Sequence, residues 1–459
     1  MVGKTEVESL RAKLRGQVIE RDDPNYEAAS KVYNAMIHKR PLLIARCLDV
    51  ADVITAIEFG RNQNLQVSIR GGGHNAGGLG ICDDGLVIDL SLMRYVRVDP
   101  KAKRIRAGGG CVWGDVDHAA HAFGLAVPAG IISTTGVGGL TLGGGLGHLT
   151  RRFGLTIDNL LSADLVLADG SFVTASAKQN EDLFWAIRGG GGNFGVVTSF
   201  EFRGQPIHTV HAGPMLWEMD QAEAVLKWYR DFIVQAPDEL NGFFAFLTVP
   251  PGPPFPEHLH LRKMCGIVWC YSGGPRKAAT ALKPARGFLR PALDLVGPLP
   301  FPVVQSMFDA LYPPGLQWYW KADFVKTLSD EAVRLHVEHG SQLPTMHSTM
   351  HLYPVNGAAA RVGPDQTPWS YRDANWAEVI VGVDPDPGKK DVLVEWARNY
   401  WEALHPHSMG GAYVNFMMEE GAERVEATYR GSYERLAAIK GKYDPKNFFR
   451  VNQNIPPKQ

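Results

Sequence analysis

The segment SIRGGGHNAGG, residues 68–78, places three consecutive glycines directly before a histidine. The residues leading into it indicate a β-strand, and Gly71 to Gly73 allow the backbone to turn so that successive N–H groups face the same way. Such a run of N–H groups forms a nest for an anion such as a pyrophosphate. His74 follows at once, so its imidazole would be held beside the anion. The segment therefore predicts a phosphate site with a histidine at its edge.

Glycine is concentrated in the part of the chain that contains this segment. Of the 50 glycines, 27 lie between Gly71 and Gly195. One cluster alone is an ordinary tight turn, whereas four in one region indicate a large phosphorylated ligand lying along it. The segment 128–154 adds hydroxyl groups that can hold a polar ligand chain. The clusters are Gly71–Gly73, Gly108–Gly110, Gly143–Gly145 and Gly189–Gly192.

Two glycine segments match the relaxed G-x-G-x-x-G/A dinucleotide pattern, and both lack its structural context. A Rossmann turn needs a helix directly after the glycines, because the helix N-terminus receives the pyrophosphate. The residues after His74, NAGGLGICDDG, read as a loop, and those after Gly195, VVTSFEF, read as a strand. We therefore reject a Rossmann site. The chain also has no G-x4-G-K-[ST] sequence, which argues against a P-loop ATPase.

The elements that must position these loops alternate irregularly between strands and helices. Residues 41–61 predict a strand and then a helix that begins near Asp49, and 112–124 predict a short helix. Residues 160–176 predict a hairpin with a two-residue turn at Asp169–Gly170. Irregular alternation favours an α+β fold over a doubly wound parallel sheet. Further strands are expected at 65–70, 85–91 and 96–110.

The composition changes near residue 205, which indicates a second domain. Proline and aromatic residues become more frequent and the glycine clusters end. Amphipathic helices are expected at about 219–235, 329–342 and 388–404. Residues 424–450 predict one helix followed by a capping segment.

Charge and composition exclude several classes of protein. Lys and Arg number 47 against 48 for Asp and Glu, so nothing draws the whole chain to nucleic acid or to an anionic membrane. No apolar run approaches the ~20 residues of a membrane span, and the polar N-terminus lacks a signal core. Five scattered cysteines form no disulfide framework. We expect a cytoplasmic protein and leave its oligomeric state open.

No metal is expected either. His118 and His121 share a helix face, and His258, His260 and Cys265 are close in sequence. Neither group is completed to a recognisable zinc spacing.

Four segments together carry a family resemblance: 68–78, 128–154, 186–202 and 443–457. In this order they resemble the berberine bridge enzyme-like flavoproteins of the vanillyl-alcohol-oxidase group. The resemblance implies FAD and an α+β fold with a two-part, PCMH-type FAD-binding domain, residues 1–205 and 410–459. It also implies a substrate-binding domain, residues 206–409, with an antiparallel sheet covered by helices.

The resemblance implies that the pyrophosphate of FAD lies on the loop from Arg70 to Asn75 and that His74 bonds covalently to the flavin 8α-methyl. Many relatives have a second link through a cysteine, at the place of Ile132 here, and some have a histidine at the place of Leu140. One covalent bond is therefore expected. The residues expected to bind FAD are Arg70, Gly71, Gly72, Gly73, His74, Asn75, Ser133, Thr134, Thr135, Gly136, Gly138, Gly139, Gly143, Gly144, Gly147, Val197, Asn452 and Gln453.

The activity implied is hydride transfer from an alcohol, sugar or amine carbon to flavin N5, with O2 as acceptor and hydrogen peroxide as product. Relatives often use the last tyrosine of Y-x-N-Y as the base, and here that position is Phe416. The candidates for the base are then Tyr413 and His351, the latter sharing a strand face with Tyr353. Asn415 is also expected at the catalytic site, as a residue that holds the strand in place. A dehydrogenase with another acceptor, and a flavin-binding protein without turnover, stay open.

The shape of the substrate pocket is the remaining expectation. The loops 248–257 and 296–304 are expected to shape it. Aromatic residues either line the pocket or form the core. They are Trp217, Trp228, Tyr229, Trp318, Tyr319 and Trp320.

Overall fold

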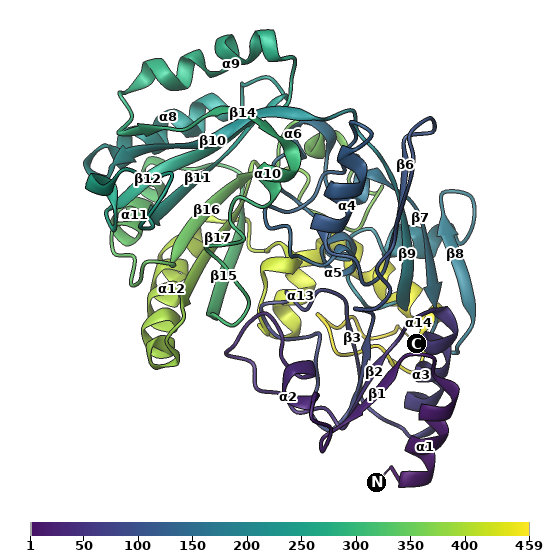
Figure 1. Cartoon of the computed structure of the whole chain (residues 1–459). Coiled ribbons are helices and arrows are strands. Elements are labelled where there is room, and N and C mark those ends of the chain that lie inside the picture. The colour runs from purple at the N-terminus through teal and green to yellow at the C-terminus, as the bar shows by residue number, and fades with distance from the viewer. Residues whose placement is uncertain (1, 459) are drawn as a thin grey trace.

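The computed structural model describes residues 2–458, and its strands form three sheets (Figure 1). The first sheet has the order β1-β2-β4-β3, with β1 antiparallel to β2 and with β2, β4 and β3 parallel. Asp49 caps the helix that follows β2 by accepting a hydrogen bond from the Asp52 N–H, as its position in the sequence predicts. The elements are α1 (Lys4–Lys13), β1 (Gln17–Glu20), α2 (Tyr26–Ala29), β2 (Leu43–Arg46), α3 (Val50–Asn62), β3 (Val67–Arg70) and β4 (Leu86–Asp89).

The second sheet is antiparallel throughout, in the order β5-β6-β9-β7-β8. The expected hairpin is present, and Gly170 takes a φ of +89° that suits glycine. Its turn is longer than two residues, because the Leu167 N–H donates to the Ser171 carbonyl at 2.9 Å. The strands are β5 (Val96–Asp99), β6 (Arg104–Gly108), β7 (Leu160–Val166), β8 (Phe172–Ser176) and β9 (Val196–Arg203), and the helices are α4 (Trp113–His121), α5 (Val137–Gly143), α6 (Thr150–Phe153), η1 (Thr156–Asn159) and α7 (Glu181–Ala186).

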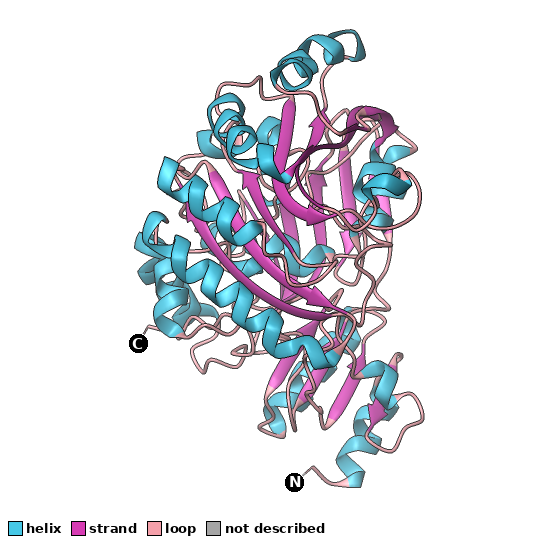
Figure 2. Cartoon of the chain, turned by 90° about the vertical axis from the view of Figure 1, so that its left-hand side faces the viewer, coloured by secondary structure: helices cyan, strands magenta, loops and turns pink. Residues whose placement is uncertain are grey.

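The third sheet has the order β13-β10-β12-β11-β16-β17-β15, with β14 also on β10. Helices cover one of its faces (Figure 2), and a buried cluster that includes Trp217, Tyr229 and Trp269 fills the space between. Its strands are β10 (Thr209–Glu218), β11 (Leu240–Thr248), β12 (Lys263–Tyr271), β13 (Leu293–Asp294), β14 (Gly297–Pro300), β15 (Gln317–Val325), β16 (Thr349–Pro354) and β17 (Trp376–Asp384). The helices here are α8 (Ala222–Ile233), α9 (Pro275–Phe288), α10 (Phe301–Gln305), α11 (Asp330–Gly340) and α12 (Lys390–Leu404).

The C-terminal segment returns to the N-terminal part of the molecule. The buried Lys440 ammonium donates to the carbonyls of Asn193, at 2.6 Å, and Phe449, at 2.9 Å, which fixes the tail against the loop before β9. The single helix predicted for the tail is wrong. Two helices, α13 (Ala422–Tyr429) and α14 (Tyr433–Tyr443), are separated at Arg430, whose φ of +47° lies outside the helical region.

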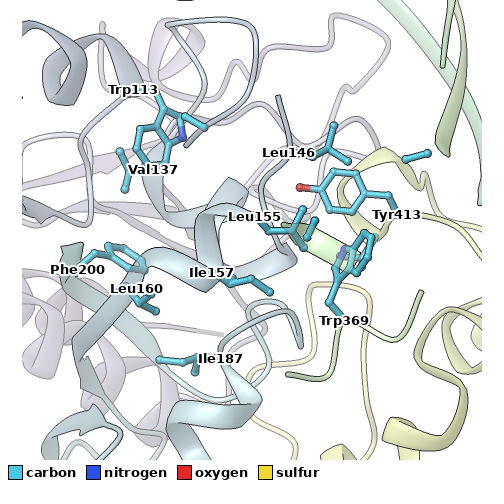
Figure 3. Close-up of a cluster of buried hydrophobic side chains, with 14 of the residues drawn as sticks. Trp113, Val137, Leu146, Leu155, Ile157, Leu160, Ile187, Phe200, Trp369 and Tyr413 are labelled. Carbon is cyan, nitrogen blue, oxygen red and sulfur yellow. The ribbon is translucent and has the colours of Figure 1, made fainter. Parts of the chain in front are cut away.

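The N-terminal region, the region that contains the third sheet and the C-terminal segment contribute side chains to one hydrophobic core. Figure 3 shows Trp113, Leu155 and Ile157 of the N-terminal region in the same cluster as Trp369 and Tyr413. The combination of sheets and helices confirms the α+β class. The division into residues 1–205 with 410–459 and residues 206–409 stays a proposal, and the placement of β10 to β17 within the second range is consistent with it.

Candidate functional site

A cavity lies where the glycine-rich loops meet the third sheet, and most of the expected site residues line it. The loop after β3 forms one end, and strands β15, β16 and β17 form the other. The predicted residues on the lining are Arg70, Gly71, Gly72, Gly73, His74, Asn75, Thr135, Gly136, Gly138, Gly139, Val197, His351, Tyr413, Asn415, Asn452 and Gln453.

Five consecutive backbone amides at the first end of the cavity have no acceptor. Within residues 2–458, the N–H groups of Gly71 to Asn75 donate to no other group. No helix follows them, which agrees with the rejection of a Rossmann turn. Gly72 also lies so close to Gly136 that a Cβ built on Gly72 would be 2.5 Å from the Gly136 nitrogen. This set of free donors beside closely spaced backbones fits a diphosphate.

His74 is fixed at the edge of this nest by contacts on both sides of its ring. Its Nε2 lies 3.1 Å from the Thr134 hydroxyl, and its Nδ1 lies 3.4 Å from that of Thr135. Tyr33 stacks on the imidazole with the ring centroids 3.8 Å apart. Burial lowers the pKa of His74 to about 4, so the ring is neutral near pH 7 and keeps a nucleophilic lone pair.

Five residues that were expected to contact the ligand are absent from the cavity lining. Their side chains are hydrogen-bonded to other residues, or, for the glycines, neighbouring groups pack against the backbone. The Ser133 hydroxyl donates to Asp309, and Thr134 is turned to His74. A Cβ on Gly144 would lie 2.9 Å from Trp369, and one on Gly143 or Gly147 would be closer still to Asn415 or to the Ala129 carbonyl. The residues are Ser133, Thr134, Gly143, Gly144 and Gly147, and they support the lining from behind.

Arg70 lines the cavity, yet its charge is already paired. Its guanidinium donates to Asp89 at 2.8 Å and to the Ala29 carbonyl at 2.6 Å. The pair joins the ends of the parallel strands β3 and β4 and so positions the loop that begins at Gly71.

At the tail, Asn452 donates to the Gly192 carbonyl at 3.1 Å, and its buried side-chain oxygen has no partner among residues 2–458. Gln453 donates to the Met418 carbonyl at 2.8 Å. Ile132 and Leu140 line the cavity, as expected from their places in the sequence, whereas the buried Cys111 is absent from the lining.

Tyr413 and Asn415 form a hydrogen-bonded unit on the lining of the cavity. The Tyr413 oxygen accepts from the Gly145 N–H and from Asn415 Nδ2, each at 2.7 Å, and Asn415 also donates to the Leu140 carbonyl at 3.0 Å. Burial raises the pKa of Tyr413 well above its ordinary value. The phenol is therefore neutral, and both residues hold the glycine loop in place.

His351 and Tyr353 share one face of β16, as the alternation of a strand predicts. His351 Nδ1 lies 2.7 Å from the Tyr353 hydroxyl, and Nε2 makes no hydrogen bond within the described chain. Burial lowers the pKa of His351 to about 3 and raises that of Tyr353. Both side chains are neutral near pH 7, and the pair can exchange a proton with a ligand hydroxyl.

The aromatic residues divide between pocket and core. Trp318 and Trp320 line the cavity, whereas Tyr319 points to the other face of β15 and receives a hydrogen bond from Arg398 at 2.9 Å. Trp217, Trp228 and Tyr229 belong to the cluster beneath the helices. The loops 248–257 and 296–304 contribute nothing to the lining, so the expectation that they shape the pocket is wrong.

Several lining residues escaped sequence reasoning. Tyr33 precedes every motif and carried no signal, and Tyr312 lies in a loop. Thr349, Val379 and Val381 follow from strand alternation once the register of β16 and β17 is known.

Two expectations concern the rest of the molecule. In residues 2–458, no three His, Cys, Asp or Glu side chains come together as a metal site would require. Over the same range, every helix is too short or too polar to cross a membrane.

Comparison with known proteins assigns the two ends of the chain to described domains. Residues 41–176 match the FAD binding domain family, and residues 412–456 match the berberine and berberine like family.

Relatives match over nearly the whole chain. An uncharacterised FAD-linked oxidoreductase of Bacillus subtilis is 32% identical over 97% of this chain and 98% of its own length. The (R)-6-hydroxynicotine oxidase of Paenarthrobacter nicotinovorans is 30% identical over 97% of each chain. The crystal structure of 6-hydroxy-D-nicotine oxidase from Arthrobacter nicotinovorans superposes with a TM-score of 0.86, at 28% identity over 97% of this chain and 98% of the other.

Proposed function

The chain belongs to the berberine bridge enzyme-like FAD-linked oxidoreductases, and from that premise we propose that it is an oxidase with FAD attached through His74. The substrate is an alcohol, sugar or amine, oxidised by hydride transfer from carbon to flavin N5. The electrons pass to O2, and hydrogen peroxide is formed.

One arrangement carries this proposal. Five unpaired amides, Gly71 to Asn75, lead to a neutral imidazole, and both face the cavity that holds His351 at its other end. The amides suit the diphosphate of FAD, and the neutral ring of His74 keeps on one nitrogen the lone pair that attack on an electrophilic 8α-methyl needs, with a threonine hydroxyl beside each ring nitrogen. The flavin, when bound, supplies the acceptor for the hydride.

The chain's own residues supply the proton chemistry. His351 is placed to accept a proton from a substrate hydroxyl or amine, because it lines the cavity and its Nε2 is unpaired within the described chain. Burial keeps the ring neutral and also makes it a weaker base than an ordinary histidine. Phe416, which lines the same cavity, has no group that could do so. Tyr413 and Asn415 position the loop that carries Gly145 and Leu140.

The experiment is to purify the protein and record its absorption near 450 nm, since oxidised flavin absorbs there, before and after acid precipitation. We expect a yellow protein whose colour precipitates with the chain. Turnover is then followed as peroxide formation in air, with and without a dye acceptor.

Turnover in air with peroxide supports the oxidase. Turnover with the dye alone would make the protein a dehydrogenase, and flavin that no alcohol, sugar or amine bleaches anaerobically would make it a flavin-binding protein. A colourless protein would contradict the proposal altogether.

A further inference from the structure

The end of the cavity at the third sheet is a wall of aromatic rings. We call Tyr312, Trp318, Trp320, Tyr353, Tyr413 and Phe416 the aromatic wall. Two neighbouring pairs meet edge to face: Trp318 and Trp320 have centroids 5.8 Å apart at 76°, and Trp320 and Phe416 are 5.9 Å apart at 78°. The pairs at the margins, Tyr312 with Trp318 and Tyr353 with Phe416, are tilted at 51° and 40°. These geometries fix the rings against one another and leave flat surfaces for a ligand ring.

Strand register extends this wall across the sheet. Trp320 of β15 lies opposite Val381 of β17, and Val381 lies opposite Thr349 of β16. His351 lies opposite Val379 one step along the same face. Aromatic rings and valines therefore surround the polar pair of His351 and Tyr353.

No carboxylate lines the cavity within the described chain. Arg70 is the one charged side chain among the lining residues; it lies at the opposite end and is neutralised by Asp89. Lys321, the neighbour of Trp320, pairs with Glu420 at 2.8 Å and is not on the lining. A primary ammonium entering here would lose its water without meeting an opposite charge, and attraction to ring faces offsets that loss only in part.

The polar groups at this end of the cavity offer a ligand few free partners: the indole N–H groups of Trp318 and Trp320 have no partner within residues 2–458, but both nitrogens are buried away from solvent. The Thr349 hydroxyl donates to the Phe246 carbonyl at 2.7 Å, and the Tyr413 oxygen accepts two hydrogen bonds. The pair of His351 and Tyr353 shares one hydrogen bond and keeps Nε2 free. One ligand hydroxyl can be served there, whereas a sugar would leave several hydroxyls without partners.

We propose that the substrate is a flat, uncharged aromatic alcohol, and that the cavity discriminates against cationic amines and sugars. This inference rests on the proposed function. The substrate ring packs on the aromatic wall and its hydroxyl donates to His351 Nε2. In the reaction the O–H bond breaks and gives its proton to Nε2. The adjacent C–H bond gives hydride to FAD, and a carbonyl product forms.

The test compares three compounds on the flavin-loaded protein: 2-naphthylmethanol, 2-naphthylmethylamine and D-glucose. The first two share a ring system and differ in charge at neutral pH. Binding is measured from the change in tryptophan fluorescence, and reduction is measured from anaerobic bleaching of the flavin. We expect the alcohol to bind at least about tenfold more tightly than the amine, since an unpaired buried charge costs at least that factor.

Substitutions of Val381, beside the aromatic wall, test the preference for the alcohol over the amine more directly. Val381→Glu places a carboxylate opposite Trp320 and Thr349, and Val381→Gln is the matched uncharged control. We expect the glutamate variant to gain at least about tenfold in its preference for the amine over the alcohol, while the glutamine variant gains nothing. If neither variant loads FAD, the wild-type comparison alone decides.

The outcomes separate the inference from the proposed function. Amine or glucose bound and oxidised as well as the alcohol would overturn the substrate class and leave the oxidase standing. Selective binding of the alcohol without flavin bleaching by any compound would support the class of ligand and contradict the oxidase. Equal binding of all three compounds without bleaching would overturn both.

Discussion

The two ends of the cavity present different kinds of groups to a ligand. At the end formed by Gly71 to Asn75, the free donors are backbone amides, and the side chains around them are absent or paired within the protein. At the other end the backbones of β16 and β17 are paired within the sheet on both sides, and the side chains of β15, β16 and β17 form the surface. A ligand shared by many proteins can be held by backbone, whereas specificity for one substrate must come from side chains that can vary.

The comparison also has an electrostatic side. Both ends hold a histidine that burial keeps neutral, with pKa values lowered to about 4 for His74 and about 3 for His351. We assign the first as a nucleophile toward the cofactor and the second as a proton acceptor toward the substrate. Changing each in turn tests whether the two ends are independent.

The largest effect is expected from His74→Ala. Removal of the imidazole eliminates the proposed nucleophile, while the five amides proposed to hold the diphosphate remain. We expect flavin that is bound in the native protein and fully released by acid. The measurement is flavin fluorescence of the polypeptide on a denaturing gel. Flavin that still migrates with the variant chain would show that another residue forms the bond.

The next largest effect is expected from a substitution of His351, at the end of the cavity formed by the third sheet. His351→Gln keeps a polar side chain but removes the proton acceptor, so anaerobic flavin reduction should slow by about 10²–10⁴ while FAD content is unchanged. Tyr319→Phe is the matched control, because Tyr319 lies on the opposite face of the same sheet. An unchanged rate in His351→Gln would remove His351 from the mechanism.

His351 also predicts a pH profile. A histidine is an acceptor only when neutral, and burial lowers the pKa of His351 from 6.5 to about 3. The rate of flavin reduction should therefore show no inflection near pH 6.5 and should fall only as the pH approaches 3. An inflection near pH 6.5 that disappears in His351→Gln would show that the ring is solvated as in an ordinary histidine.

A smaller effect is expected from Gly72→Ala. The added Cβ would lie 2.5 Å from the Gly136 nitrogen, so one backbone must move, at a cost of about 1–3 kcal/mol. We expect a lower FAD content and a lower Tm. The control is Gly287→Ala in α9, where a Cβ meets nothing within 4 Å, and which should raise stability slightly. Wild-type FAD loading in Gly72→Ala would mean that the loop is not tightly confined.

The smallest effect concerns the residue that joins the two ends. Tyr33 stacks on His74, and its hydroxyl donates to the Tyr312 carbonyl at 2.6 Å. Tyr33→Phe keeps the stack and loses the hydrogen bond, so about 1 kcal/mol of stability should be lost while covalent attachment persists. Denaturant unfolding measures the loss of stability, and flavin fluorescence on a denaturing gel measures covalent attachment. Loss of attachment in Tyr33→Phe would show that the hydroxyl, and not the ring, positions His74.

The two ends differ equally in what could be predicted from sequence. The loop from Gly71 to His74 is continuous in the chain, so its glycines and histidine were readable as one motif. The aromatic wall is assembled from two strands, β15 and β16, and from the segments that carry Tyr312, Tyr413 and Phe416. The two strands are brought side by side by β17 between them, whose Val381 pairs with Trp320 on one side and with Thr349 on the other. The alternation of side chains along a strand did predict that His351 and Tyr353 lie on the same face, because both belong to β16.

Other misses have the same physical origin. Ser133 was expected to contact the ligand, but Asp309, far away in the sequence, takes its hydroxyl. The break at Arg430 divides a segment whose residue types suit one helix. Tyr33 reaches His74 only because the chain after α2 crosses the loop, which no local pattern indicates.

The most direct test of the central claim is a tryptic map of the purified wild-type protein. Cleavage after Arg70 and Arg94 gives the peptide 71–94, which contains His74 as its one histidine and also Cys82. We predict that this peptide carries the flavin absorption and the added mass of FAD, and that fragmentation places it on His74. Flavin on any other peptide, on Cys82, or released entirely by the digest would contradict the account.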